Sequence, residues 1–153
     1  MPPKPPGDSL TKAQAYLRGA VTLLRAGLWE PATQDAYYAC FHATLALLAT
    51  AGTGAETHRG TRQLLALHFA RPGLVPEGLP RLLGQITADR ELATYGVANE
   101  VGEAAARETA KRAAEFLGTV LPVIAARDPA AGPAAAGLLV LLPDLAAAGD
   151  GNG

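Results

Sequence analysis

The chain has 153 residues, a length that suits one domain, and 49% of them are apolar while 18% are charged. Its formal net charge of −1 requires neither a nucleic-acid nor a membrane partner, although a local basic patch could still bind RNA. The single cysteine, Cys40, excludes a disulfide scaffold and fits a reducing compartment.

The first part of the chain predicts a lead-in followed by two helices. Residues 1–8 hold four prolines and no apolar signal core, so we expect a flexible start and a helical domain from residue 9. Apolar residues spaced by three and four over residues 10–24 predict an amphipathic helix that ends near Gly27. Residues 30–50 predict a second helix, because Pro31 is well placed in its first turn.

Three further segments complete the predicted domain. Residues 58–70 and 80–95 each carry a helical pattern, and Leu92 belongs to the apolar stripe of the latter. Asn99 is a candidate cap for a last long helix whose stripe starts at Ala105, and Pro122 is expected to kink or shorten it. The prediction is therefore an all-α fold, an antiparallel up-and-down bundle of four to five helices over residues 9–126.

The C-terminal residues 127–153 differ in composition from the rest. They are rich in alanine, glycine and proline and nearly uncharged, which predicts a flexible tail with one apolar segment at residues 138–142. That segment could also fold back onto the bundle or dock a partner. No stretch approaches 18 clean apolar residues, so no membrane span and a cytoplasmic location are expected.

The second predicted helix carries the densest chemistry. At about 100° per residue, Tyr37 and Phe41 lie on a face that should be core, while Asp35, Tyr38 and His42 lie together on another. The second face combines a carboxylate, a phenol and an imidazole. Either it lines a groove that binds a nucleotide, an RNA or a partner helix, or its polar tips form hydrogen bonds across a subunit interface.

Four segments in the right order resemble the prokaryotic HEPN domain family. Residues 36–43, Ala-Tyr-Tyr-Ala-Cys-Phe-His-Ala, are similar to the family's second-helix signature. Residues 57–60, Thr-His-Arg-Gly, are similar to its His-basic-Gly step, and residues 90–95 to its Arg-x-x-Ala-Asp-Tyr element. Residues 113–117 are similar to its closing Ala-x-x-Phe-Leu pattern.

The resemblance implies a helical bundle that commonly dimerises. In many members the dimer cleft holds a metal-independent ribonuclease site with an Arg-x(4–6)-His motif, and many members pair with a small nucleotidyltransferase in toxin–antitoxin or defence systems. The resemblance places Arg90 and Tyr95 at the positions of the catalytic pair. Because an unperturbed tyrosine titrates near pH 10, Tyr95 is a poor general acid or base. We therefore expect Arg90 and Tyr95 to contact RNA or a phosphate.

The remaining candidate residues are predicted to contact RNA, a nucleotide or a partner, and they are Asp35, Tyr38, His42, His58 and Arg59. Two of the site residues have structural alternatives of their own: an ion pair for Arg90, and a cap or packing role for His58. Three scattered histidines and one cysteine lack metal-ligand spacing, so neither a metal nor another cofactor is predicted.

Three hypotheses follow from these observations. The chain is a homodimeric binding and assembly module that pairs with a nucleotidyltransferase, a ribonuclease toxin that uses Arg90 at a dimer cleft, or a helical scaffold without a nucleic-acid role. The altered Arg-x4-Tyr pair leaves the question of enzymatic activity open, and the near-neutral charge is compatible with the scaffold.

Overall fold

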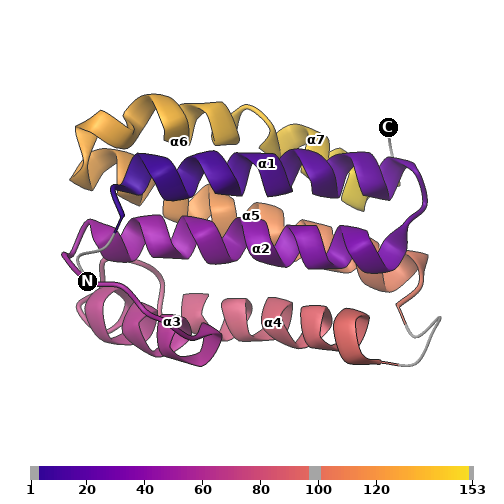
Figure 1. Cartoon of the computed structure of the whole chain (residues 1–153), viewed down its shortest axis with the longest axis horizontal. Helices are drawn as coiled ribbons and strands as arrows, with labels where there is room; N and C mark the ends of the chain where they lie inside the picture. Colours follow the sequence, from indigo (N-terminus) through magenta and orange to yellow (C-terminus); the bar gives the residue numbers. More distant parts are fainter. Residues whose placement is uncertain (1–3, 97–100, 152–153) are drawn as a thin grey trace.

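Figure 1 shows a computed structural model of the chain, which describes residues 4–96 and 101–151. The described residues form helices and turns and contain no strand, as the sequence predicts. The elements in chain order are α1 (Pro6–Arg25), α2 (Trp29–Ala49), α3 (His58–Leu65), η1 (Ala66–Ala70), α4 (Leu79–Tyr95), α5 (Glu103–Arg127), η2 (Pro129–Ala131), α6 (Gly132–Leu139) and α7 (Leu142–Gly149).

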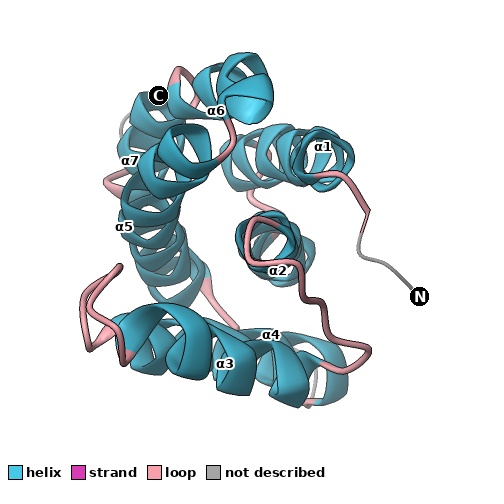
Figure 2. Cartoon of the chain, turned by 90° about the vertical axis from the view of Figure 1, so that its left-hand side faces the viewer, coloured by secondary structure: helices cyan, strands magenta, loops and turns pink. Residues whose placement is uncertain are grey.

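The long helices run up and down, and α2 lies at their centre. Figure 2 shows α2 between α1, α5 and α4, and it contacts each of them. α3 and η1, a single π-helical turn, lie beside α4 at one side of the bundle. The central position of α2 explains why its apolar residues are spread around the helix and not confined to one stripe.

The apolar spacing of α1 is confirmed by the core. Its stripe of Leu10, Ala13, Leu17, Ala20 and Leu24 is buried throughout. Gly27 ends the helix with a φ of 74°, a conformation that favours glycine, and the amide of Leu28 donates to the carbonyl of Leu23. The result is a tight turn that sends α2 back along α1.

Several local predictions differ from the structure. α1 begins at Pro6 and not at residue 9, because the prolines supply a preformed first turn. Leu92 is 46% exposed, since the last turn of α4 places the neighbouring Ala93 in the core instead. Pro122 lies inside α5, which continues to Arg127, and Asn99 lies outside the described residues.

The C-terminal segment forms helices where the sequence favours a flexible tail. α6 and α7 lie along α1 and α5 (Figure 1), and they bury Leu138 and Leu145 against the bundle. Lys111 of α5 forms an ion pair with Asp150 at 3.3 Å. The burial of these side chains agrees with the alternative in which the apolar segment folds back onto the bundle.

By length and composition, Pro129–Gly149 is apolar enough to cross a membrane, which the sequence reading did not anticipate. The structure divides this segment between α6 and α7, with Val140 and Leu141 at the break. Leu138 and Leu145 are buried against the bundle, but only 22% of the apolar window is buried, so much of the segment stays outside the core.

Candidate functional site

The candidate site is a cluster of aromatic rings around Arg90, which reaches from α4 to α2. Its Nη2 atom donates a hydrogen bond to the hydroxyl of Tyr38 at 2.9 Å. Its guanidinium carbon lies 5.4, 5.5 and 5.9 Å from the ring centres of Tyr37, Tyr38 and Tyr95. These distances suit cation–π attraction, so tyrosines rather than a carboxylate hold this cation.

His58 joins the cluster from the first turn of α3. Its Nδ1 forms a hydrogen bond with the hydroxyl of Tyr37, and its ring centre lies 4.6 Å from that of Phe41. The side chain of Thr57 caps α3 by accepting from the amide of Gly60 at 2.9 Å. A side chain at Gly60 would press on the Thr57 hydroxyl, which explains the glycine in the His-Arg-Gly step.

His42 extends the cluster along α2 toward the start of α1. Its ring stacks on Tyr16 at 5.5 Å between centres, and Tyr16 stacks on Tyr38 at 5.2 Å. His42 also lines a cavity of about 410 Å³ together with Lys4 and Lys12. The cluster therefore presents a row of rings with cationic groups at both ends.

The surroundings lower the pKa of both histidines. Burial is the main cause for His58, followed by the positive charge of Arg90, while Glu91 acts in the opposite direction. Burial is also the main cause for His42, followed by Lys12, Lys4 and His58. Both imidazoles are therefore neutral at neutral pH.

The same physics keeps Tyr37 protonated. Burial raises the pKa of Tyr37 far above its usual value, even though Arg90 acts to lower it. A protonated phenol can either donate to Nδ1 of His58 or accept from Nδ1–H, so the tautomer of His58 sets the direction of this hydrogen bond. In either tautomer one ring nitrogen of His58 is tied to Tyr37.

Arg90 keeps unused hydrogen-bonding capacity. Burial acts to lower the pKa of Arg90, but the hydrogen bond to Tyr38 and the neighbouring phenols raise it above the ordinary value. Its Nε atom is buried and has no hydrogen-bond partner among the described residues. The guanidinium is therefore a permanent, oriented cation whose buried Nε is left unsatisfied by the described residues, and a cation held in this way is suited to binding a phosphate through its accessible nitrogen atoms.

The structure brings most predicted site residues together. Tyr38, His42, His58, Arg90 and Tyr95 belong to one cluster, although Tyr95 is 76% exposed. This grouping joins α2 to residues that follow about 20 to 60 positions later in the chain.

Asp35 and Arg59 lie apart from it. Asp35 was predicted to lie together with Tyr38 and His42, but its carboxylate fills the space over Gly19 of α1 and does not join the rings. Burial raises the pKa of Asp35. Arg59 is exposed and lines a different hollow, between α3 and α4.

Sequence reasoning missed three rings of the cluster. Tyr37 and Phe41 were expected only as core, and Tyr16 was not singled out, yet all three contact site residues. Tyr16 lies beside the apolar stripe of α1, and an aromatic residue at the edge of such a stripe is the sequence signal that could have identified it as a site residue. Within residues 4–96 and 101–151, no group of three or more His, Cys, Asp or Glu side chains is placed to hold a metal ion.

Comparisons with known proteins match this chain to one family and to archaeal relatives. The family model described as HEPN domain matches residues 7–123. UPF0332 protein PH1297 from Pyrococcus horikoshii is 31% identical over 85 residues, 56% of this chain and 60% of that protein. A UPF0332 protein from Archaeoglobus fulgidus is 32% identical over 108 residues, 71% of this chain and 86% of that protein.

A protein named "Putative toxin MJ0605", from Methanocaldococcus jannaschii, is 32% identical over 71 residues, 46% of this chain and 53% of that protein. The matches to PH1297 and MJ0605 thus span between half and two thirds of those relatives. α6 and α7 follow the part of the chain that the family model matches.

Proposed function

The chain belongs to the HEPN domain family, and on that premise we propose that it is a binding and assembly module of a toxin–antitoxin or defence system. It acts as a homodimer with a nucleotidyltransferase partner, and the cluster around Arg90 contacts RNA or a nucleotide. The word toxin in the name of the Methanocaldococcus jannaschii relative supports the system, and the resemblance noted in the sequence supports the partner and the dimer.

The observation that carries the proposal is the hydrogen bonding of Arg90 and His58. Arg90 is a half-buried cation with no carboxylate partner among the described residues, which favours phosphate binding. His58 is tied to Tyr37 by a hydrogen bond, and Tyr95 stands where the nuclease subgroup has histidine. This arrangement supports binding over proton transfer.

A ribonuclease is the second candidate, and one observation favours it. His58 contacts the rings of Tyr37 and Tyr38 beside Arg90, and His42 is linked to Tyr38 through Tyr16, so a titratable group is near the cation. Cleavage would use the 2′-hydroxyl of RNA as the internal nucleophile, with Arg90 on the phosphate, and the 5′-oxygen would leave with a proton from solvent. His58 would take the proton of the 2′-hydroxyl on the ring nitrogen that its tautomer leaves unprotonated.

The test measures RNA binding and RNA cleavage on the same preparations. Wild type, Arg90→Ala and the surface control Arg18→Ala are incubated with labelled tRNA, and affinity is measured at several salt concentrations. We expect salt-dependent binding without cleavage, weakened about tenfold or more by Arg90→Ala and unchanged by Arg18→Ala, since a charge-assisted hydrogen bond contributes about 1.5–3 kcal/mol. Circular dichroism checks that each variant is folded.

Each alternative has its own outcome. Cleavage that disappears in Arg90→Ala would identify a ribonuclease. Neither binding nor cleavage by folded wild type would favour the helical scaffold. Light scattering and co-purification with a nucleotidyltransferase from the native host test the dimer and the partner separately.

A further inference from the structure

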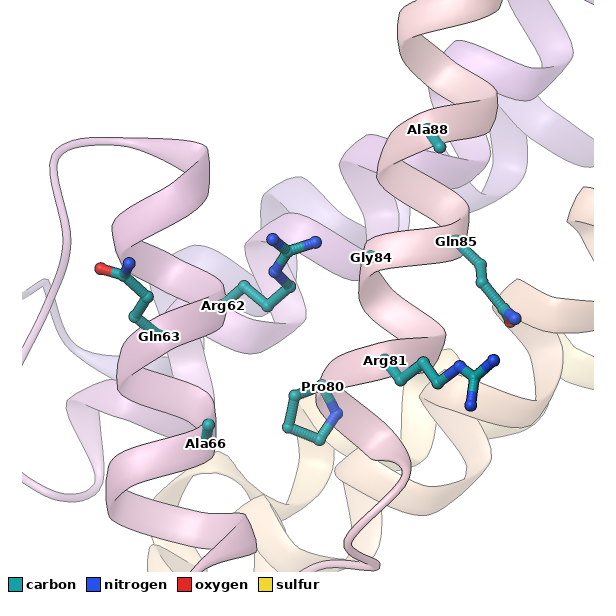
Figure 3. Close-up of a pocket in the computed structure, with 8 residues that line it drawn as sticks. All are labelled: Arg62, Gln63, Ala66, Pro80, Arg81, Gly84, Gln85 and Ala88. Carbon is teal, nitrogen blue, oxygen red and sulfur yellow. The ribbon is translucent and has the colours of Figure 1, made fainter.

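A second surface lies on the other side of α4, in the groove between α4 and the α3–η1 segment. Three adjoining hollows of about 290, 500 and 700 Å³ share lining residues, so they form one continuous groove. Figure 3 shows its central part, with Gln63 and Ala66 on one wall and Gly84 and Ala88 on the other. This groove adjoins the aromatic cluster at His58, which lines one end of it.

The groove exists because both walls carry small side chains. α4 presents Pro80, Gly84 and Ala88 at intervals of four residues, which places them on one face of the helix. The opposite wall presents Ala66 and Ala70, while Phe69 of the same π-helical turn is fully buried in the core. The floor is therefore apolar and shallow, and the side chain of Arg62 crosses it above Gly84.

The rim of the groove is cationic. Arg59, Arg62, Arg71 and Arg81 line its length, and none of them forms an ion pair within the described part of the chain. Arg62 lies across the groove over Gly84, where a methyl group would come 2.5 Å from its Nη1 (Figure 3). Its guanidinium thus lies inside the groove without a carboxylate.

We propose that this groove docks an acidic amphipathic helix from a partner protein. Small apolar side chains repeating every three or four residues would lie on the alanine and glycine floor, and flanking carboxylates would pair with the arginines. α3 and η1 have 8 and 5 residues, so the groove offers roughly 20 Å, enough for about three to four turns of a partner helix.

Charge and shape together favour a protein helix over RNA at this site. The arginines would attract either, but single-stranded RNA needs aromatic rings on which bases stack. Among the described residues that line the groove, the one ring other than that of Pro80 is the imidazole of His58 at one end. Glu77 and Glu91 stand at the two ends, where they would disfavour a longer phosphate backbone.

This inference rests on the proposed assembly role, but it does not depend on RNA contact at Arg90. The probe is a synthetic helical peptide of roughly 15 residues, matched to the groove length. It has alanine at every third or fourth position and glutamate on both flanks. A second peptide carries lysine in place of every glutamate. Fluorescence anisotropy measures the affinity of the full chain for both.

We expect the glutamate peptide to bind saturably. The lysine peptide should bind at least about tenfold more weakly, because its charges repel the arginines of the groove. Gly84→Leu, which fills the floor, and the double variant Arg62→Glu/Arg81→Glu should each weaken binding of the glutamate peptide about tenfold or more. The exposed Arg18→Glu on α1 is the matched charge control and should change the affinity less than about twofold.

The proposal is overturned if both peptides bind equally, if neither binds, or if the groove variants bind like wild type. If the protein is a dimer and Gly84→Leu converts it to a monomer, the groove binds a second copy of the chain. If Gly84→Leu abolishes RNA binding, the groove binds RNA. Because the double variant changes only exposed side chains, it keeps the test valid if Gly84→Leu folds poorly. RNA binding lost only in Arg90→Ala belongs to the proposed function, so either proposal can fail alone.

Discussion

The substitution Tyr38→Phe removes one hydroxyl from the aromatic cluster and preserves its rings. The ring contact with Tyr16 and the cation–π contact with Arg90 persist, while Nη2 of Arg90 loses its acceptor at 2.9 Å. Because Nε of Arg90 already has no partner among the described residues, the variant leaves a half-buried cation with two unsatisfied nitrogens. The cost should therefore exceed that of an exposed hydrogen bond.

A hydrogen bond to a charged group contributes about 1.5–3 kcal/mol, and partial exposure of Arg90 moves the expectation to about 1–2 kcal/mol. For a domain of this size each kcal/mol corresponds to roughly 2–4 °C in melting temperature. Urea unfolding measures the free energy, and RNA titration measures whether the displaced guanidinium binds less tightly. We expect both to decrease together.

Tyr16→Phe is the matched control for this experiment. Tyr16 belongs to the same stack, and its hydroxyl makes no hydrogen bond within the described residues. Its removal should change the unfolding free energy by less than about 0.5 kcal/mol. Equal effects of Tyr38→Phe and Tyr16→Phe would refute the reasoning, because they would show that the Arg90 hydrogen bond contributes nothing to stability.

Two further predictions concern pH and the C-terminal helices. NMR titration should show His42 and His58 below the usual histidine pKa, and Arg90→Met should raise the pKa of His58 while leaving that of His42 unchanged. Since the pKa values of both histidines are lower in the folded state, their contribution to the free energy of unfolding should be fully present above pH about 6.5 and should decrease as the pH falls below it. An increase in stability as the pH falls would contradict the lowered pKa values. Leu138→Ala should lower the free energy of unfolding by about 3 kcal/mol, because this side chain is fully buried. Val140 is 71% exposed, so Val140→Ala should lower it by less than about 0.5 kcal/mol. Equal effects of the two substitutions would argue against a docked α6.

The helices could be predicted from sequence because local spacing determines them. α2 appears within one residue of its predicted bounds, α1 begins three residues before the predicted start at residue 9, and the whole predicted stripe of α1 is buried, together with Ser9 and Val21. The C-terminal helices were missed because alanine, glycine and proline are typical of flexible chain. Their helical structure depends on the burial of Leu138 and Leu145 against α1 and α5, which is a tertiary effect without a local signal in the sequence.

The site was predictable in membership but not in its connections. The resemblance pointed to Arg90, and helical spacing pointed to Tyr38 and His42, yet nothing local shows that Arg90 donates to Tyr38 across 52 positions. Tyr37 was expected only as core. Its spacing does not show that the buried phenol also presents its hydroxyl to His58. Amphipathic side chains of this kind have two roles, and spacing reveals one.

The two surfaces of α4 meet at His58. On one face of α4, Arg90 holds the aromatic cluster, and on the other, Gly84 and Ala88 line the groove whose end is formed by His58 and Glu91. Arg90 and Glu91 already act on the pKa of His58 in opposite directions. Carboxylates of a helix docked in the groove would act on the pKa of His58 in the same direction as Glu91, which favours the charged imidazole. Docking of the glutamate peptide should therefore raise the pKa of His58, and NMR titration with and without the peptide would measure this change.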